Sequence, residues 1–150
     1  MAKKKELKQI VFSWHKSTGL EIGWNNSEVT YTADDDYVIV AIQGMVETFQ
    51  TAVDTQVMGA QLSYDTKAFP SLTGPMGEAV RRRCLMFLCS GVFTLGTAAG
   101  AGNLFAHETI VFPEDCRPEL DEDDQLNLHV FTSDIDEGGQ VTFILHVYEK

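Results

Sequence analysis

Two segments near the C-terminus alternate, residue by residue, between apolar side chains and side chains of mixed character. The apolar positions are Leu126, Leu128 and Val130 in the first segment, and Val141, Phe143, Leu145 and Val147 in the second. A period of two places alternate side chains on opposite faces of a β-strand, so each segment is expected to bury one face. Because a buried strand must pair its backbone groups with other strands, this feature commits the chain to a β-sheet fold.

Turn-forming residues, SDIDEGGQ at 133–140, separate the two segments and predict a hairpin. Burial of both apolar sets on one side then requires a register such as Val130 opposite Phe143. In that register the outer face of the hairpin carries His129, Phe131, Ile144, His146 and Tyr148. This face is too apolar for a free surface, so we expect a neighbouring subunit or another segment to cover part of it.

The rest of the chain repeats the strand pattern in shorter pieces. Apolar alternation or β-branched runs predict strands at 10–15, 20–24, 29–32, 37–42, 90–97 and 107–112. Residues 45–64 suit a helix or a strand, and their β-branched content favours a strand. Residues 78–89 are expected to open as a short helix in which Glu78 and Arg82 pair. The pattern therefore predicts an all-β antiparallel sandwich or barrel with one short helix.

The length of 150 residues is that of one ordinary domain. We expect a single β-sandwich domain over 8–150, preceded by a flexible basic arm over 1–7. The net charge is −11, and residues 17–150 hold 21 acidic against six basic residues, which leaves that part near −15. Such a body repels nucleic acid over most of its surface.

Two clusters of cations stand out on this acidic chain. Lys3, Lys4 and Lys5 lie in the arm, where we expect any contact with nucleic acid to occur. Arg81, Arg82 and Arg83 are adjacent in the body. Adjacent guanidinium groups favour acidic partners, and we expect them to meet Asp123 and Asp124 of another copy across a subunit interface. Contact of these arginines with phosphate stays an alternative.

The three cysteines, Cys84, Cys89 and Cys116, fit neither a disulfide framework nor a zinc site, since their number is odd and no CxxC pair occurs. Free thiols indicate a reducing cytoplasm. The N-terminal stretch MAKKKELKQ lacks the apolar region of a secretory signal, and no apolar run reaches the roughly 18 residues that a membrane span needs. We therefore expect a protein that is made in the cytoplasm and not secreted.

The acidic stretch PEDCRPELDEDDQLNLHVF, at 113–131, is a candidate metal or catalytic site. A calcium loop of the EF-hand type that starts at Asp121 needs Gly at its sixth position and Glu at its twelfth, where this chain has Leu126 and Thr132. We interpret the stretch as a solvated turn that ends a strand. Calcium held jointly by carboxylates of residues 34–36 and 121–124 stays an alternative.

The remaining motifs do not combine into a catalytic site. The four histidines lack the His-x-His spacing of a metal-binding cupin. The glycine-rich GTAAGAG, at 96–102, matches neither a phosphate-binding loop nor a dinucleotide-binding turn. The apolar run CLMFLC, at 84–89, predicts buried thiols in place of an activated nucleophile. We predict a protein that is not an enzyme and that uses no cofactor or metal.

The segments PELDEDDQLNLHVF and GGQVTFILHVYEK, together with the arm MAKKKELK, resemble small jelly-roll virion structural proteins. The resemblance implies an antiparallel β-sandwich of jelly-roll type. It implies a structural component of a virus or phage particle, made in the host cytoplasm, that assembles with copies of itself and other virion proteins. Because 150 residues is short for a genome-enclosing shell subunit, a minor or decoration protein is favoured.

The alternative function is a β-sandwich module that binds calcium or carbohydrate. In that case Trp14, Trp24 and Tyr31 would supply aromatic surface on which sugar rings stack.

Overall fold

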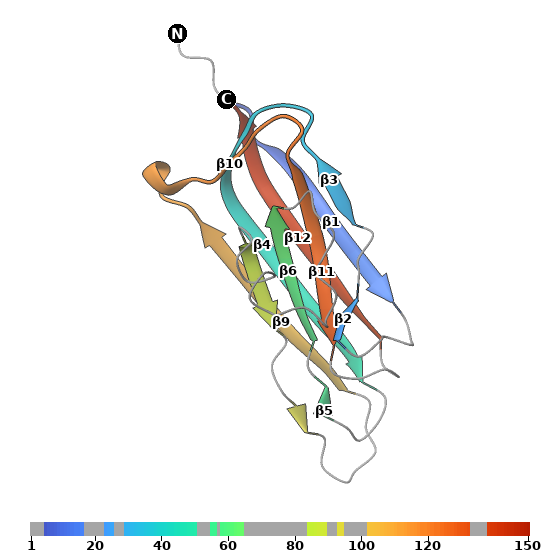
Figure 1. Cartoon of the computed structure of the whole chain (residues 1–150). Coiled ribbons are helices and arrows are strands. Elements are labelled where there is room, and N and C mark those ends of the chain that lie inside the picture. Colours follow the sequence, from blue (N-terminus) through green and yellow to red (C-terminus); the bar gives the residue numbers. More distant parts are fainter. Residues whose placement is uncertain are drawn as a thin grey trace.

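The computed structural model describes residues 5–16, 23–25, 29–50, 55–56, 58–64, 84–89, 93–94, 102–132 and 138–150 (Figure 1). Its strands are β1 (Lys8–Lys16), β2 (Gly23–Asn25), β3 (Thr30–Thr32), β4 (Tyr37–Gln50), β5 (Thr55–Gln56), β6 (Met58–Tyr64), β7 (Cys84–Cys89), β8 (Phe93–Thr94), β9 (Gly102–Val111), β10 (Glu119–Leu120), β11 (Gln125–Thr132) and β12 (Gly138–Glu149). A short 3-10 helix, Glu114–Cys116, lies between β9 and β10. Among these residues no helix is long and apolar enough to cross a membrane.

The strands form two main antiparallel sheets. Sheet A has the order β1-β12-β4, and both β9 and β10 pair with the far side of β4. Sheet B has β11 and β6 at its centre, with β2 and β3 beside β11 and β7 beside β6. The short strands β5 and β8 pair separately. Seen in Figure 1, the first and the last strand of the chain lie side by side in sheet A.

The order of the strands is that of a jelly roll. Along the chain β1 belongs to sheet A, β2 and β3 to sheet B, β4 to sheet A, β6 and β7 to sheet B, β9 to sheet A, β11 to sheet B and β12 to sheet A. The chain thus wraps repeatedly around one core, with its last strand inserted beside its first, as two Greek keys require. The predicted antiparallel sandwich of jelly-roll type is confirmed.

The predicted hairpin between the two alternating C-terminal segments is wrong. Strand β11 pairs with β6, β2 and β3, whereas β12 pairs with β1 and β4, so the two segments lie in opposite sheets. Each segment does bury the expected side chains: Val130 and Phe143 are both fully buried in the same core. Alternation determines which face of a strand is buried, but it carries no information about the partner strand.

The core lies between the sheets and is built from these alternating positions. Ile10 and Phe12 enter it from β1, Leu145 from β12 and Ile42 from β4. Each large apolar side chain that is fully withdrawn from water contributes roughly 1.5–3 kcal/mol. Because the long strands of both sheets supply side chains to one cluster, the sheets hold each other in place, and their outer faces are the surfaces on which a function can be built.

The predicted short helix at 78–89 is wrong where the structure describes it. Residues 84–89 form β7, which pairs with β6, and Met86 and Leu88 point into the core. Burial of alternate side chains against a neighbouring strand outweighs helix propensity here. Residues 78–83 lie outside the described residues. The strand predictions for 37–42 and for 107–112 are confirmed, and the described parts of 45–64 are strands, as their β-branched content indicates.

Candidate assembly surfaces and the Tyr31–Asp34–Tyr37 pocket

The acidic turn at 121–124 lies against the acidic turn at 34–36. The amide of Glu122 donates to Asp36 Oδ1 (2.9 Å), and the amide of Asp123 donates to the carbonyl of Ala33 (3.0 Å). Within the turn, the amide of Asp121 donates to Asp124 Oδ2 (3.0 Å). Asp123 adopts a positive φ of 70°, a conformation that Asp tolerates better than most residues. The stretch is thus a structured turn that fixes the start of β11.

The two acidic turns therefore meet, as the calcium alternative requires, but their carboxylates serve another purpose. Asp36 and Asp124 accept backbone hydrogen bonds, and the Lys150 ammonium lies 2.5 Å from a Glu119 oxygen and 3.7 Å from one of Asp121. Within the part of the chain that the structure describes, no group of three or more His, Cys, Asp or Glu side chains is placed to hold a metal ion.

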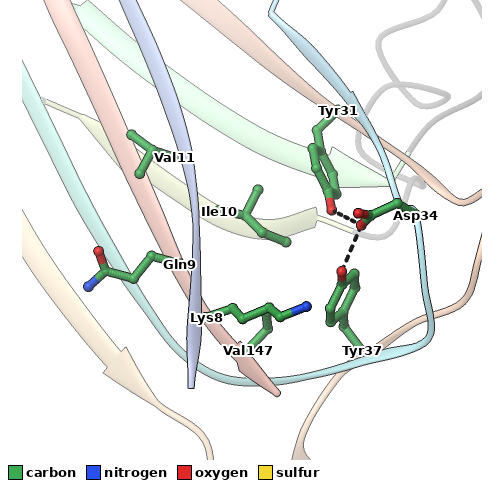
Figure 2. A pocket seen from close by; sticks show the side chains of 8 residues that line it. All are labelled: Lys8, Gln9, Ile10, Val11, Tyr31, Asp34, Tyr37 and Val147. Atoms are coloured by element: carbon green, nitrogen blue, oxygen red, sulfur yellow. Dashed lines mark hydrogen bonds between the residues drawn. The ribbon is translucent and has the colours of Figure 1, made fainter. Parts of the chain in front are cut away.

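A pocket of about 360 Å³ lies beside the turn at 34–36, between β1, β3 and the start of β4 (Figure 2). The hydroxyls of Tyr31 and Tyr37 both donate to Asp34 Oδ1, at 3.0 Å and 2.7 Å. The Lys8 ammonium lies 5.7 Å from the centre of the Tyr37 ring and pairs with Glu149. The sequence points to Tyr31 and to the carboxylates of 34–36 separately, but not to the sharing of Asp34 by tyrosines of β3 and β4.

The hydrogen bonds of the pocket shift the pKa values of its members in opposite directions. The hydroxyls of Tyr37 and Tyr31 lower the pKa of the Asp34 carboxyl. The hydrogen bond to Asp34 raises the pKa of Tyr37 to about 12, and burial followed by the same carboxylate raises the pKa of Tyr31. All three groups therefore stay in one protonation state around neutral pH. The arrangement ties the turn at 34–36 to β3 and β4, and it does not favour proton transfer.

Replacing Asp34 with asparagine is expected to lower the melting temperature at pH 7 by roughly 2–5 °C, because the two phenols lose their charged acceptor. The pKa of Asp34 is lower in the folded chain than its ordinary value of 3.8. The Asp34 carboxylate therefore stabilises the fold fully at pH values above 3.8, and this stabilisation is lost as the pH falls through the lower pKa of the folded chain. The difference in melting temperature between the variant and the wild type should therefore disappear in strong acid. Thermal melts between neutral and acid pH test this, with the exposed Asp115→Asn as control; a difference that is constant with pH contradicts it.

The outer face of sheet A is formed by four strands in continuous register. Its side chains come in four rows, which are Gln9–His146–Ala41–Val111, Val11–Ile144–Gln43–Thr109, Ser13–Thr142–Met45–His107 and His15–Gln140–Glu47–Phe105. Each of these residues is exposed or half-buried, whereas their chain neighbours in β12 are buried. We call this surface the sheet A face.

The sheet A face is almost free of charge, although 22 % of the chain is charged. Its rows contain one carboxylate, that of Glu47, and no Lys or Arg. Glu47 accepts a hydrogen bond of 2.6 Å from the Gln140 amide. Large apolar side chains are exposed on the same face: Val11 by 58 %, Phe105 by 57 % and Val111 by 68 %. Low charge combined with exposed apolar side chains is typical of the centre of a protein–protein interface.

The residues predicted to share one apolar outer face are divided between the two sheets. Ile144 lies in the second row of the sheet A face, whereas Phe131 lies on β11 in sheet B, paired with Gly59 and Trp24. His129 and His146, predicted to be neighbours, are likewise on different sheets. The physical reason is the crossing between sheets after residue 132, which replaces the predicted hairpin.

The N-terminal arm covers part of the predicted surface. The Lys5 ammonium lies 4.1 Å from the centre of the Tyr148 ring, a cation–π contact. This contact comes from a segment of the same chain, one of the two coverings that the sequence predicts for this surface. Lys3 and Lys4 lie outside the described residues, and their contact with nucleic acid stays a prediction.

Of the two sides of the predicted charge pairing between subunits, the structure describes only the acidic one. Asp123 is exposed and Asp124 is half-buried, with its carboxylate used inside the turn. Arg81, Arg82 and Arg83 lie outside the described residues. Their contact with Asp123 and Asp124 of another copy therefore stays a prediction.

The outer face of sheet B differs from that of sheet A. Gln61 on β6 and His129 on β11 point outward and yet are buried, as is Ser63. Phe87 on β7 is 54 % exposed and packs close to Gly59. The centre of this face is thus already covered, and the sheet A face is the open one.

The aromatic residues proposed to stack against sugars are engaged inside the fold. Tyr31 meets Phe12 edge-on, with ring centres 6.2 Å apart, and its hydroxyl is bonded to Asp34. Trp14 packs against the core. The side chain of Trp24 lies outside the described residues. This arrangement does not favour the carbohydrate-binding alternative.

No protein-family model matches the sequence. The search of curated proteins found no match either.

Solved structures that match the chain are those of viral or subviral particles. The structure of infectious bursal disease virus, Gx strain, is matched over 98 % of this chain and 37 % of its own, with 16 % identity and a TM-score of 0.37. The VP2 subviral particle of that virus is matched over 95 % of this chain and 37 % of its own, with 12 % identity and a TM-score of 0.39. Its T=1 particles are matched over 95 % of this chain and 36 % of their own, with 13 % identity and a TM-score of 0.40.

These matched proteins are of the virion class that the closing segments of this sequence resemble. The chain spans little more than a third of their length. The jelly-roll assignment rests on the strand order alone.

Proposed function

We propose that the chain is a non-enzymatic structural component of a virus or phage particle, which acts by assembling with copies of itself and with other virion proteins. The observation that carries the proposal is the jelly-roll strand order, in which β12 is inserted between β1 and β4. Jelly rolls of this kind serve as capsid domains, lectin domains and cupins. The candidate sites described above bear on the choice between these uses.

The described sites favour the capsid use over the other two. In the acidic turns, the carboxylates of Asp36 and Asp124 accept backbone hydrogen bonds, and that of Asp121 lies near the Lys150 ammonium. In the pocket beside the turn at 34–36, the Asp34 carboxylate accepts hydrogen bonds from the hydroxyls of Tyr31 and Tyr37. What remains accessible is a broad surface, the sheet A face, and broad surfaces suit assembly better than catalysis.

Sedimentation of the purified chain over a wide range of micromolar concentrations tests the proposal. We expect species larger than the 16.7 kDa monomer, and uniform assemblies by electron microscopy. A chain that stays monomeric at every concentration contradicts the proposal. A rise of the melting temperature on addition of millimolar calcium would instead favour the calcium-binding alternative.

A further inference from the structure

We infer that two copies of this chain pack against each other through the sheet A face. The inference rests on the proposed function, which requires self-association but does not say where it occurs. It places the contact on the outer side chains of four strands, β1, β12, β4 and β9, which Figure 1 shows as ribbons. By the register of these strands, Ile144 and Gln43 lie on the two central strands and Val11 lies on the edge strand β1.

The shape of the face suits packing of sheet on sheet. The four strands are paired continuously, so their outer side chains form a pleated surface without an intervening loop. Two such surfaces stack with their sheets about 10 Å apart and interdigitate their side chains. The inner faces of sheets A and B already do this in the core. A second copy would repeat the arrangement on the outer side of sheet A.

The charges of the molecule select a second copy as the occupant. The net charge is −11, and carboxylates are concentrated in the turns at 34–36 and 121–124 and around the helix Glu114–Cys116. Two identical copies that approached through these regions would repel each other. On the sheet A face the only carboxylate is Glu47, so like copies can meet there. A basic partner would be attracted to the acidic turns instead.

The polar side chains of the face are of a kind that can pair with themselves. In a two-fold contact each residue meets residues of the same surface. Glutamine amides and the hydroxyls of serine and threonine both donate and accept hydrogen bonds, so copies of Gln43 or Thr142 can satisfy each other. A carboxylate or an ammonium group cannot do this. The uncharged polar residues, Gln9, Gln43, Gln140, Ser13, Thr109 and Thr142, therefore make the face self-complementary.

Two phenylalanines on opposite sheets provide a matched test. Phe105 lies on the sheet A face and is 57 % exposed, and Phe87 lies on sheet B and is 54 % exposed. We expect Phe105→Glu and Phe105→Lys each to weaken self-association at least tenfold, because a charge of either sign is desolvated in the contact. We expect Phe87→Glu and Phe87→Lys to change it less than threefold. Sedimentation velocity measures association, and circular dichroism confirms that each variant is folded.

The possible results separate this inference from the proposed function. If the wild type assembles and the Phe105 variants assemble equally well, the inference is overturned while the proposed function stands. If Phe105→Lys strengthens association and Phe105→Glu weakens it, net charge and not burial controls assembly, and the inference is also overturned. If the wild type never assembles, both fail. Variants of Phe105 that do not fold would be replaced by Val111→Glu and Val111→Lys, at a position that is 68 % exposed.

Discussion

Replacing Phe143 with alanine is expected to lower the free energy of unfolding by about 3–5 kcal/mol, a large part of the stability of a domain of this size. The ring is fully buried between the sheets. Opposite it on β4 stands Gly44, and a Cβ placed there would lie 2.8 Å from Phe143 Cε1. Gly44 has no side chain that could move into the space, and the neighbouring Met86 side chain can fill only part of it, so the substitution leaves a cavity.

The next residue along β12 is the matched control. Ile144→Ala also truncates an apolar side chain, although it removes fewer atoms than Phe143→Ala. Because Ile144 is half-buried on the sheet A face, we expect a loss of about 1 kcal/mol or less. Urea denaturation of both variants at one low protein concentration measures the difference. Equal losses at the two positions would contradict the assignment of faces along β12. The same pair also separates folding from assembly, because Ile144→Ala should weaken self-association while leaving the fold intact.

The burial pattern of this fold was predictable from the sequence because it is a local property. Strict alternation in 126–131 and 141–147 identified the buried side chains of β11 and β12, and the structure buries each of them. The apolar run at 37–42 likewise predicted a strand at the centre of a sheet, and β4 pairs on both sides. These predictions need only the geometry of a single strand.

The pairing of strands was not predictable in the same way, because it depends on residues far apart in the chain. The turn-forming residues at 133–140 are compatible with a hairpin and with a crossing between sheets. The structure uses the crossing, so that β12 lies beside β1, more than a hundred residues away in sequence. The prediction that Phe131, Ile144 and Tyr148 share one face failed for this reason alone. Each of the three side chains does lie outside the core.

For the candidate surfaces too, the sequence predicts what a single strand determines and does not predict what depends on strand pairing. Val11 could have been recognised as outward-facing from the alternation at 10–15, since its neighbours Ile10 and Phe12 are buried. Its position in the same row as Ile144 and Thr109 needs the register of four strands. The Tyr31–Asp34–Tyr37 network had a weak local signal, because these three residues are each three apart in the sequence around a turn.

Fixed positive charges at the histidine positions of the sheet A face are expected to weaken self-association. Three of the four histidines, His15, His107 and His146, lie on this face. A lysine side chain is charged at neutral pH, and burying it without a partner is unfavourable. In a two-fold contact each added charge is buried together with its copy. The rows of the face contain one carboxylate, that of Glu47, so most of the added charge stays uncompensated. We expect the double variant His107→Lys and His146→Lys to associate at least tenfold more weakly than the wild type.

The opposite result has an equally clear physical meaning, which makes this experiment decisive. If the two positions lie outside the contact, the added lysines only reduce the net charge of −11 and with it the repulsion between copies, so association should strengthen. Sedimentation velocity of the variant and of the wild type distinguishes the two signs, with circular dichroism to confirm that each chain is folded. The matched control combines His107→Gln and His146→Gln, because glutamine can donate and accept hydrogen bonds and adds no charge. A lysine variant that associates as strongly as this control would place the contact elsewhere on the molecule.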